Sequence, residues 1–139
     1  MTEEKRIYVV VSETVDTPKG VITQPAGRLA AQACHATSRM RMARMQQKLS
    51  KIKTDKEIKE HELVKESITT IVLGARDSKE LGHIEFLLNK AGLEYEAFTD
   101  TNEEAYGKAS VFTALATYPI AKSEVEGILD YLPLWAPKK

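Results

Sequence analysis

The sequence has little cysteine, no long hydrophobic run and a long stretch without acidic residues. Its single cysteine, Cys34, cannot form an internal disulfide, which is typical of proteins from a reducing cytosol. Because Cys34 lies among alanines in a helical pattern, we expect a small buried side chain rather than a nucleophile. The opening residues lack the apolar core of a signal peptide, and no segment is long enough to span a membrane. A cytoplasmic protein without a membrane partner is therefore expected.

Several kinds of catalytic site are also missing. The scattered histidines and the single cysteine do not form a zinc-binding set, so no metal site is predicted. The chain contains neither a phosphate-binding glycine loop nor the Gly-x-Ser-x-Gly turn of a serine hydrolase. His83-Ile-Glu85 has the form of a zinc-deaminase motif, but the accompanying Pro-Cys-x-x-Cys is absent. His83 is better interpreted as a residue on the surface of a helix.

Acidic residues are absent between Asp16 and Asp55, although the whole chain carries 20 basic and 20 acidic residues. The cations of this interval are Lys19, Arg28, Arg39, Arg41, Arg44, Lys48, Lys51 and Lys53. A region of one charge sign attracts polyanions, and phosphates release counterions when they are neutralised. We favour a nucleic acid as the partner over a membrane surface, because no bulky aromatic residue accompanies the cations.

The length of 139 residues fits one domain spanning residues 1–139, and 42% hydrophobic residues are enough for a core. Hydrophobic periodicity predicts strands at 6–12, 68–73, 94–99 and 110–117, with a long loop at 13–26. Helices are predicted from Gly27 to about Lys51, from a cap at Ser78 to Gly92, and from a cap at Ser123 to Leu132. The charged region 53–66 is either a helical extension or a mobile excursion. The order β-α-β-α-β-β-α predicts an α/β fold, a three-layer α/β/α sandwich on a four-stranded mixed sheet.

The first predicted helix has two distinct faces. One face carries polar side chains at i, i+4, i+7 and i+11, namely Arg28, Gln32, His35 and Arg39. The other is apolar and fit to pack on a sheet, with Leu29, Ala33, Ala36, Met40 and Ala43. A fixed cation, an amide and an imidazole on one face suit an anionic, oxygen-rich ligand. The same pattern also fits an amphipathic helix whose polar face is simply solvated.

Three segments and one single residue, Asp100, together resemble a known family. Ala26-Gly-Arg-Leu-Ala-Ala-Gln-Ala-Cys-His-Ala36 is similar to the Gly-Lys-x-Ala-Ala-Gln-x-x-His-Ala signature of the type 2 peptidyl-tRNA hydrolases. Asp100, the strand Ser110-Val-Phe-Thr-Ala-Leu-Ala-Thr-Tyr-Pro119 and Val125-Glu-Gly-Ile-Leu-Asp-Tyr-Leu132 resemble later elements of that family, in the same order. The resemblance implies the same sandwich fold and a homodimer without cofactors. It also implies hydrolysis of the ester between a peptide and the 3′-terminal adenosine of tRNA.

The resemblance assigns roles to individual residues. It implies a catalytic set of Arg28, Asp100 and Thr113, in which Asp100 orients or deprotonates the attacking water and Arg28 stabilises the developing oxyanion. Taken with the basic interval, it implies contacts with tRNA or substrate from Gln32, His35, Arg39, Lys19 and Glu104. Purely structural interpretations of these residues stay open, because Asp100-Thr-Asn102 also suits a turn and Thr113 is an ordinary strand residue.

Two positions depart from the family pattern. Arg28 stands where the family has lysine, so it can hold an oxyanion or phosphate but cannot shuttle a proton. Glu104 stands where the family has a threonine, in a loop that two acidic residues make less favourable for an RNA end. Two alternatives to a hydrolase therefore stay open: a divergent member that binds RNA without cleaving it, and an interaction module whose basic helix binds an acidic protein.

Overall fold

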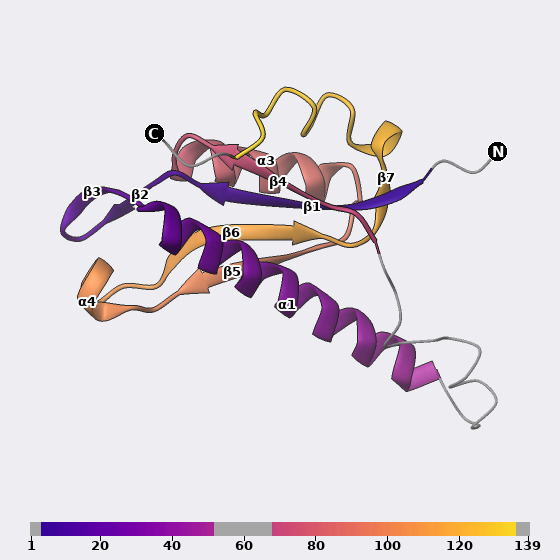
Figure 1. Cartoon of the computed structure of the whole chain (residues 1–139), viewed down its shortest axis with the longest axis horizontal. Helices are drawn as coiled ribbons and strands as arrows, with labels where there is room; N and C mark the ends of the chain where they lie inside the picture. The colour runs from indigo at the N-terminus through magenta and orange to yellow at the C-terminus, as the bar shows by residue number, and fades with distance from the viewer. Residues whose placement is uncertain (1–3, 52–67, 136–139) are drawn as a thin grey trace.

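The computed structural model describes residues 4–51 and 68–135 (Figure 1). The charged region 53–66, predicted to be a helical extension or an excursion, lies outside these residues. Within the described part, the predicted α/β sandwich on a mixed sheet is confirmed.

The central sheet has the strand order β4-β1-β6-β5. Its strands are β1 (Lys5–Ser12), β4 (Thr70–Ala75), β5 (Tyr95–Asp100) and β6 (Val111–Thr117). β1 pairs with β4 in parallel, whereas β6 runs antiparallel to both β1 and β5. A short strand, β7 (Ile120–Ala121), adds an antiparallel pair to the start of β1. The sheet therefore has one more, very short strand than the four predicted.

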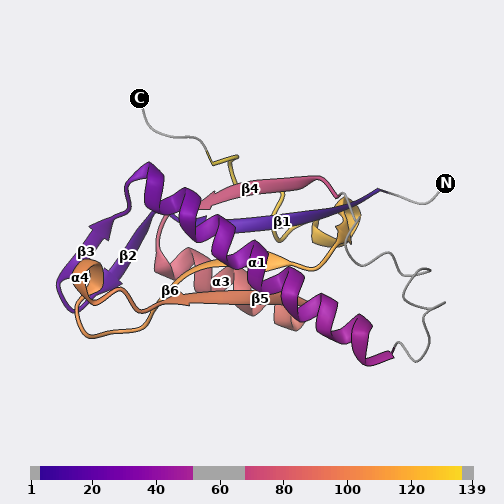
Figure 2. The ribbon, with the colours of Figure 1, turned by 60° about the horizontal axis from the view of Figure 1, so that its bottom comes forward.

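Helices cover both faces of this sheet, as Figures 1 and 2 show. α1 (Ala26–Lys51) crosses one face and buries Leu29, Ala33, Ala36 and Met40 against β1 and β6. α3 (Ser78–Lys90) covers the other face with Leu81, Ile84 and Leu88. Side chains alternate along the strands, so Ala114 and Ala116 of β6 face α1 while Leu115 faces α3. The apolar face predicted for the first helix is the one that packs on the sheet.

The predicted loop at 13–26 is wrong in part, because it contains a β-hairpin. β2 (Thr14–Thr17) and β3 (Gly20–Thr23) pair antiparallel, and Gly20 at φ +103° allows the tight turn after Pro18 and Lys19. A short helix, α4 (Glu103–Tyr106), follows β5 between the third and fourth predicted strands, where no helix was predicted. The hairpin and α4 pack together around a third small core of Val15, Tyr106 and Val111.

The predicted last α-helix is also wrong. A 3-10 turn, η1 (Lys122–Val125), is followed by further turns, and Gly127 interrupts the segment at φ +78°. The apolar spacing that suggested a helix still buries Val125, Leu129 and Leu132 in the core on the α3 side. Beyond Pro133 the chain runs beside β4, where the Trp135 amide donates to the Val72 carbonyl at 2.9 Å.

Two smaller sequence predictions need correction. The cap of α3 is Asp77, whose carboxylate accepts from the Glu80 amide, and not Ser78, whose hydroxyl accepts from the Asp16 amide of the hairpin. Cys34 is exposed rather than buried, because it lies on α1 just beside the stripe that faces the sheet.

Candidate active site

Four chain segments meet at one end of the sheet. These are the end of β1, the hairpin, the first turns of α1, and the end of β5 with α4, as Figure 1 shows near the labels β2 and α4. The carboxyl ends of the parallel strands β1 and β5 both point to this end. Side chains that follow strands and begin helices gather here, which is the usual place for a site in an α/β fold.

Gln32 and Asp100 form the centre of this region. Gln32 is 2% exposed, and its Nε2 donates to Asp100 Oδ2 at 2.6 Å. The other carboxylate oxygen of Asp100 accepts from the backbone amide of Asn102 at 3.0 Å. Asp100 therefore makes the turn contact expected from its sequence context and, in addition, a short contact with α1. Each carboxylate oxygen accepts one of these hydrogen bonds, which leaves acceptor capacity for a water or a substrate hydroxyl.

Tyr106 and Gln24 complete a buried network that sequence reasoning missed. The Tyr106 hydroxyl donates to Gln24 Oε1 at 2.7 Å and accepts from Gln32 Nε2 at 3.3 Å. Gln24 Nε2 in turn donates to the Ser12 carbonyl at 2.7 Å. Recognition of the Thr-Pro-Lys-Gly turn would have revealed the hairpin and placed Gln24 beside the end of β1. No sequence pattern singles out Tyr106.

Burial and the negative charge of Asp100 raise the pKa of Tyr106 above its usual value of 10.0. The amide of Gln32 and the positive charge of Arg28 oppose this shift. The hydroxyl therefore keeps its proton across the neutral range and acts as the donor toward Gln24.

Arg28 lies one turn before Gln32 on α1, and its guanidinium sits over the ring of Tyr106, with 5.6 Å from Cζ to the ring centroid. This is the separation of a cation–π contact. Among the described residues, no ion pair within 4.0 Å joins Arg28 to Asp100. Arg28 thus contacts Tyr106 of the network, and among the described residues no ion pair with Asp100 neutralises its charge.

Thr113 lies at a β-bulge. The pairing of β5 with β6 shifts between Phe98, opposite Ala114, and Thr99, opposite Phe112, so Thr113 is the extra residue. Its hydroxyl is buried and, like Gln32 Oε1, has no hydrogen-bond partner in the described part of the chain. Bulges are over-represented next to active sites, and a catalytic role is one explanation for an unsatisfied buried polar atom. The catalytic role of Thr113 stays a prediction, since its hydroxyl makes no hydrogen bond to Asp100 or to any other described residue.

His35 and Arg39 lie further along the same face of α1 and do not contact the central network. The His35 ring stacks on Phe98 with centroids 4.9 Å apart and an interplanar angle of 23°. Arg39 Nε is 4.0 Å from Glu96 Oε2. Both line an open groove of about 470 Å³ between α1 and the edge strand β5.

Lys19 and Glu104 link the hairpin to α4. Lys19 Nζ donates to the backbone carbonyl of Glu104 at 3.0 Å, and its stem lies against Gly107. The Glu104 side chain is exposed at the start of α4. Lys19 thus fixes α4, which carries Tyr106, against the hairpin.

Within residues 4–51 and 68–135, no group of three or more His, Cys, Asp or Glu side chains is arranged to hold a metal ion. In the same ranges, no helix has the length and apolar character needed to cross a bilayer.

Comparison with known proteins gives one clear result. The family model described as Peptidyl-tRNA hydrolase PTH2 matches residues 6–135. A search of curated proteins finds no significant match. The matched range includes every strand and helix except the first residue of β1, and it spans all of the candidate site residues.

Proposed function

The chain belongs to the peptidyl-tRNA hydrolase PTH2 family, and from this premise we propose that it hydrolyses the ester bond of peptidyl-tRNA, releasing tRNA and peptide. The observation that carries the proposal is the 2.6 Å hydrogen bond from Gln32 to Asp100. These residues come from two separate segments that resemble family motifs, and they are 68 positions apart. Their direct contact supports a single site built from both motifs.

Ester hydrolysis needs an activated water and a group that stabilises the oxyanion of the tetrahedral intermediate. In our proposal Asp100 binds the water and accepts its proton, while Gln32 and the Asn102 amide hold the carboxylate in place. Arg28 stabilises the negative charge that develops on the former carbonyl oxygen. The intermediate then collapses: the carbonyl re-forms, the ester bond breaks, and the 3′ oxygen of the tRNA leaves with the proton that Asp100 took from the water.

An arginine at position 28, where the family has lysine, fits a role in charge stabilisation without proton transfer. The guanidinium stays charged and can stabilise an oxyanion, although it cannot transfer a proton. Its place over the Tyr106 ring gives it a fixed direction. We therefore propose that Arg28 is an electrostatic group and that proton transfer belongs to Asp100, with Thr113 as a further polar group beside the reacting ester.

The tRNA would lie along α1. Arg39 is exposed beside the groove that His35 and Phe98 line, and Lys19 and Glu104 flank the other end of the site. This arrangement supports a path for the acceptor arm from the groove to Asp100. We further propose that the chain works as one cytoplasmic domain and as a homodimer, and that it needs no cofactor.

The proposal is tested by incubating the purified chain with peptidyl-tRNA beside an active peptidyl-tRNA hydrolase and measuring released tRNA. Binding of uncharged tRNA is measured in parallel over a range of salt. If about five cations contact phosphates, log K should fall against log salt with a slope of roughly −4. Salt-dependent binding without cleavage would support a divergent, non-hydrolytic member. A flat salt dependence together with no cleavage would support the protein-interaction alternative.

A further inference from the structure

Tyr106 joins the hairpin side of the candidate site to the α1 side. Its side chain is 0% exposed, its hydroxyl contacts Gln24 and Gln32, and its ring lies under Arg28. Its backbone is fixed by α4, where the Tyr106 amide donates to the Asn102 carbonyl at 2.9 Å. A buried side chain with so many contacts can transmit small changes of position.

The hydrogen bonds of this network have a fixed direction. Gln24 Nε2 donates to the Ser12 carbonyl, so its Oε1 faces Tyr106 as an acceptor. The single proton of the Tyr106 hydroxyl goes to Gln24, and the oxygen can then only accept from its other neighbour. That neighbour is the Gln32 amide, which must present its NH₂ group rather than its carbonyl.

The same NH₂ group donates to Asp100. If the amide of Gln32 were rotated, its Oε1 would face both the carboxylate and the Tyr106 oxygen, which would be repulsive. The backbone carbonyl of Ser12 therefore sets the orientation of the Gln32 amide through two side chains, Gln24 and Tyr106. The raised pKa of Tyr106 is consistent with a hydroxyl that stays protonated in this role.

We infer that Gln24 and Tyr106 are positioning residues, which fix the orientation of the Gln32 amide and through it the carboxylate of Asp100. Gln24 immediately follows the β2–β3 hairpin, and its backbone N–H donates to the Glu13 carbonyl at 2.9 Å. The hairpin is thus a structural part of the site. The catalytic consequence of this inference rests on the proposed hydrolase function, whereas the orientation of Gln32 does not.

The first test is a double-mutant cycle on hydrolysis. Tyr106→Phe removes only the hydroxyl and keeps the ring under Arg28. We expect it to lower kcat about tenfold, the scale of one hydrogen bond, with KM changed less than about twofold. In a Gln32→Met background the same change should lower kcat by less than about twofold, because the hydroxyl would act only through Gln32. An equal loss in both backgrounds would overturn the inference.

The second test does not depend on activity. The side-chain NH₂ resonances of Gln32 are followed by NMR in the native chain, in Tyr106→Phe and in Gln24→Met. We expect both substitutions to shift or broaden these resonances. Tyr95→Phe is the matched control: its hydroxyl accepts from Asn89 Nδ2 at 3.0 Å at the far end of α3. It should leave the Gln32 resonances unchanged.

The two tests separate the possible failures. A native chain that does not cleave peptidyl-tRNA contradicts the proposed function, and the NMR test still decides whether Gln24 and Tyr106 orient Gln32. Unchanged Gln32 resonances in both variants would overturn the inference even in an active enzyme. Gln24→Met removes the hydrogen bond of the network on its hairpin side. If Tyr106→Phe folds poorly, the Gln32 resonances of Gln24→Met still decide whether the network orients Gln32.

Discussion

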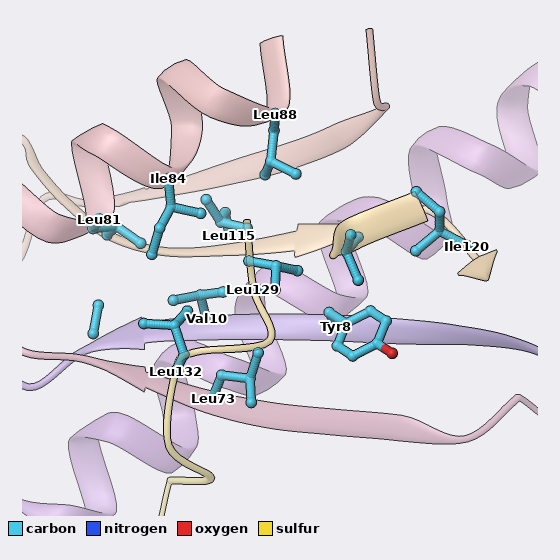
Figure 3. Packing of buried hydrophobic residues seen from close by; sticks show 12 residues of the cluster. Tyr8, Val10, Leu73, Leu81, Ile84, Leu88, Leu115, Ile120, Leu129 and Leu132 are labelled. Atoms are coloured by element: carbon cyan, nitrogen blue, oxygen red, sulfur yellow. The ribbon is translucent and has the colours of Figure 1, made fainter. Parts of the chain in front are cut away.

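The two faces of the sheet are built from different side chains. The face under α3 is filled with large aliphatic groups, including Leu81, Ile84 and Leu88 from the helix and Leu115 from β6, as Figure 3 shows. The face under α1 combines larger side chains, such as Leu29 and Met40, with small residues, such as Ala36 on the helix and Ala114 on the strand. Large interlocking side chains contribute most of the hydrophobic stabilisation of a core.

Small residues under α1 have a different consequence. They let the helix lie close to the sheet, so that the amide of Gln32 can reach the end of β5 at 2.6 Å from Asp100. The polar network of Gln24, Gln32 and Tyr106 is buried on this side of the molecule, next to the hairpin. We propose that the α3 face chiefly stabilises the fold and that the α1 face also positions the candidate site. Substitutions on the two faces should therefore separate stability from activity.

The largest expected effect is on the α1 face, at Asp100. Asp100→Asn should lower kcat about 1000-fold because it removes the proposed base, with little change in tRNA affinity. Asp130→Asn is the matched control, since Asp130 Oδ1 accepts from the Gly127 amide far from the site. A single-turnover assay and a tRNA-binding assay check both. Similar losses in the two variants would contradict the assignment.

On the α3 face, Leu88→Ala should lower the free energy of unfolding by about 3 kcal/mol, because the side chain is fully buried. At a temperature where the variant remains folded, kcat should be close to native. Phe86 lies on the same helix and is 60% exposed, so Phe86→Ala should change stability by only about 0.5 kcal/mol. Urea unfolding followed by circular dichroism measures the stability of both variants. A large loss of kcat in folded Leu88→Ala would contradict the proposed difference between the two faces.

Arg28→Ala should lower kcat about 100-fold, the usual cost of removing one oxyanion-stabilising group. Arg28→Lys keeps the charge and restores a group that can carry a proton, so kcat should stay the same or rise. Arg76→Ala provides the control, because Arg76 is an exposed cation paired with Glu80 beside α3. The three variants are compared by steady-state kinetics. Equal kcat for Arg28→Ala and the native chain would remove Arg28 from the mechanism.

Ala36→Val tests the close approach of α1 directly. Ala36 is 0% exposed, and two added methyl groups should push the helix from the sheet at a cost of about 1–2 kcal/mol. Because Gln32 moves with the helix, kcat should fall about tenfold as its contact with Asp100 is misplaced. Ala30→Val changes an exposed position of the same helix and should leave kcat nearly native. Thermal unfolding and kinetics of both variants show whether activity and stability change together.

The smallest effect is expected at alkaline pH. The pKa of Tyr106 is raised by burial and by Asp100, so the folded state binds its proton more tightly than the unfolded state. The stabilisation is complete below pH 10.0 and is lost as pH rises through the higher pKa of the folded state. Tyr106→Phe should therefore show a shallower fall of unfolding free energy above pH 10.0 than the native chain, as urea unfolding at several pH values would show.

Much of the fold was predictable because it follows from local periodicity. The strands around Val9 and Leu115 and the two long helices are marked by apolar spacing, and Gly92 marks the end of α3. The prediction of a last helix failed because the spacing of Val125, Leu129 and Leu132 indicates only that these side chains are buried. Turns around Gly127 bury them equally well. Local patterns specify which residues are buried better than they specify the backbone that buries them.

The site divides in the same way. Gln32 and Asp100 were predictable from segments that resemble family motifs, and the structure joins them. Gln24 and Tyr106 belong to no motif, and their importance arises from contacts across 82 positions of sequence that only the folded hairpin and α4 create. The burial of Gln32 on the polar face of α1 has the same cause, since α4 covers it with Tyr106.

The most direct test of the account is single-turnover cleavage of peptidyl-tRNA by the purified native chain. We predict that free tRNA and free peptide appear together and that the rate is independent of added metal or cofactor. Binding of peptidyl-tRNA with no cleavage, under conditions where an active hydrolase of this family completes the reaction, would contradict it.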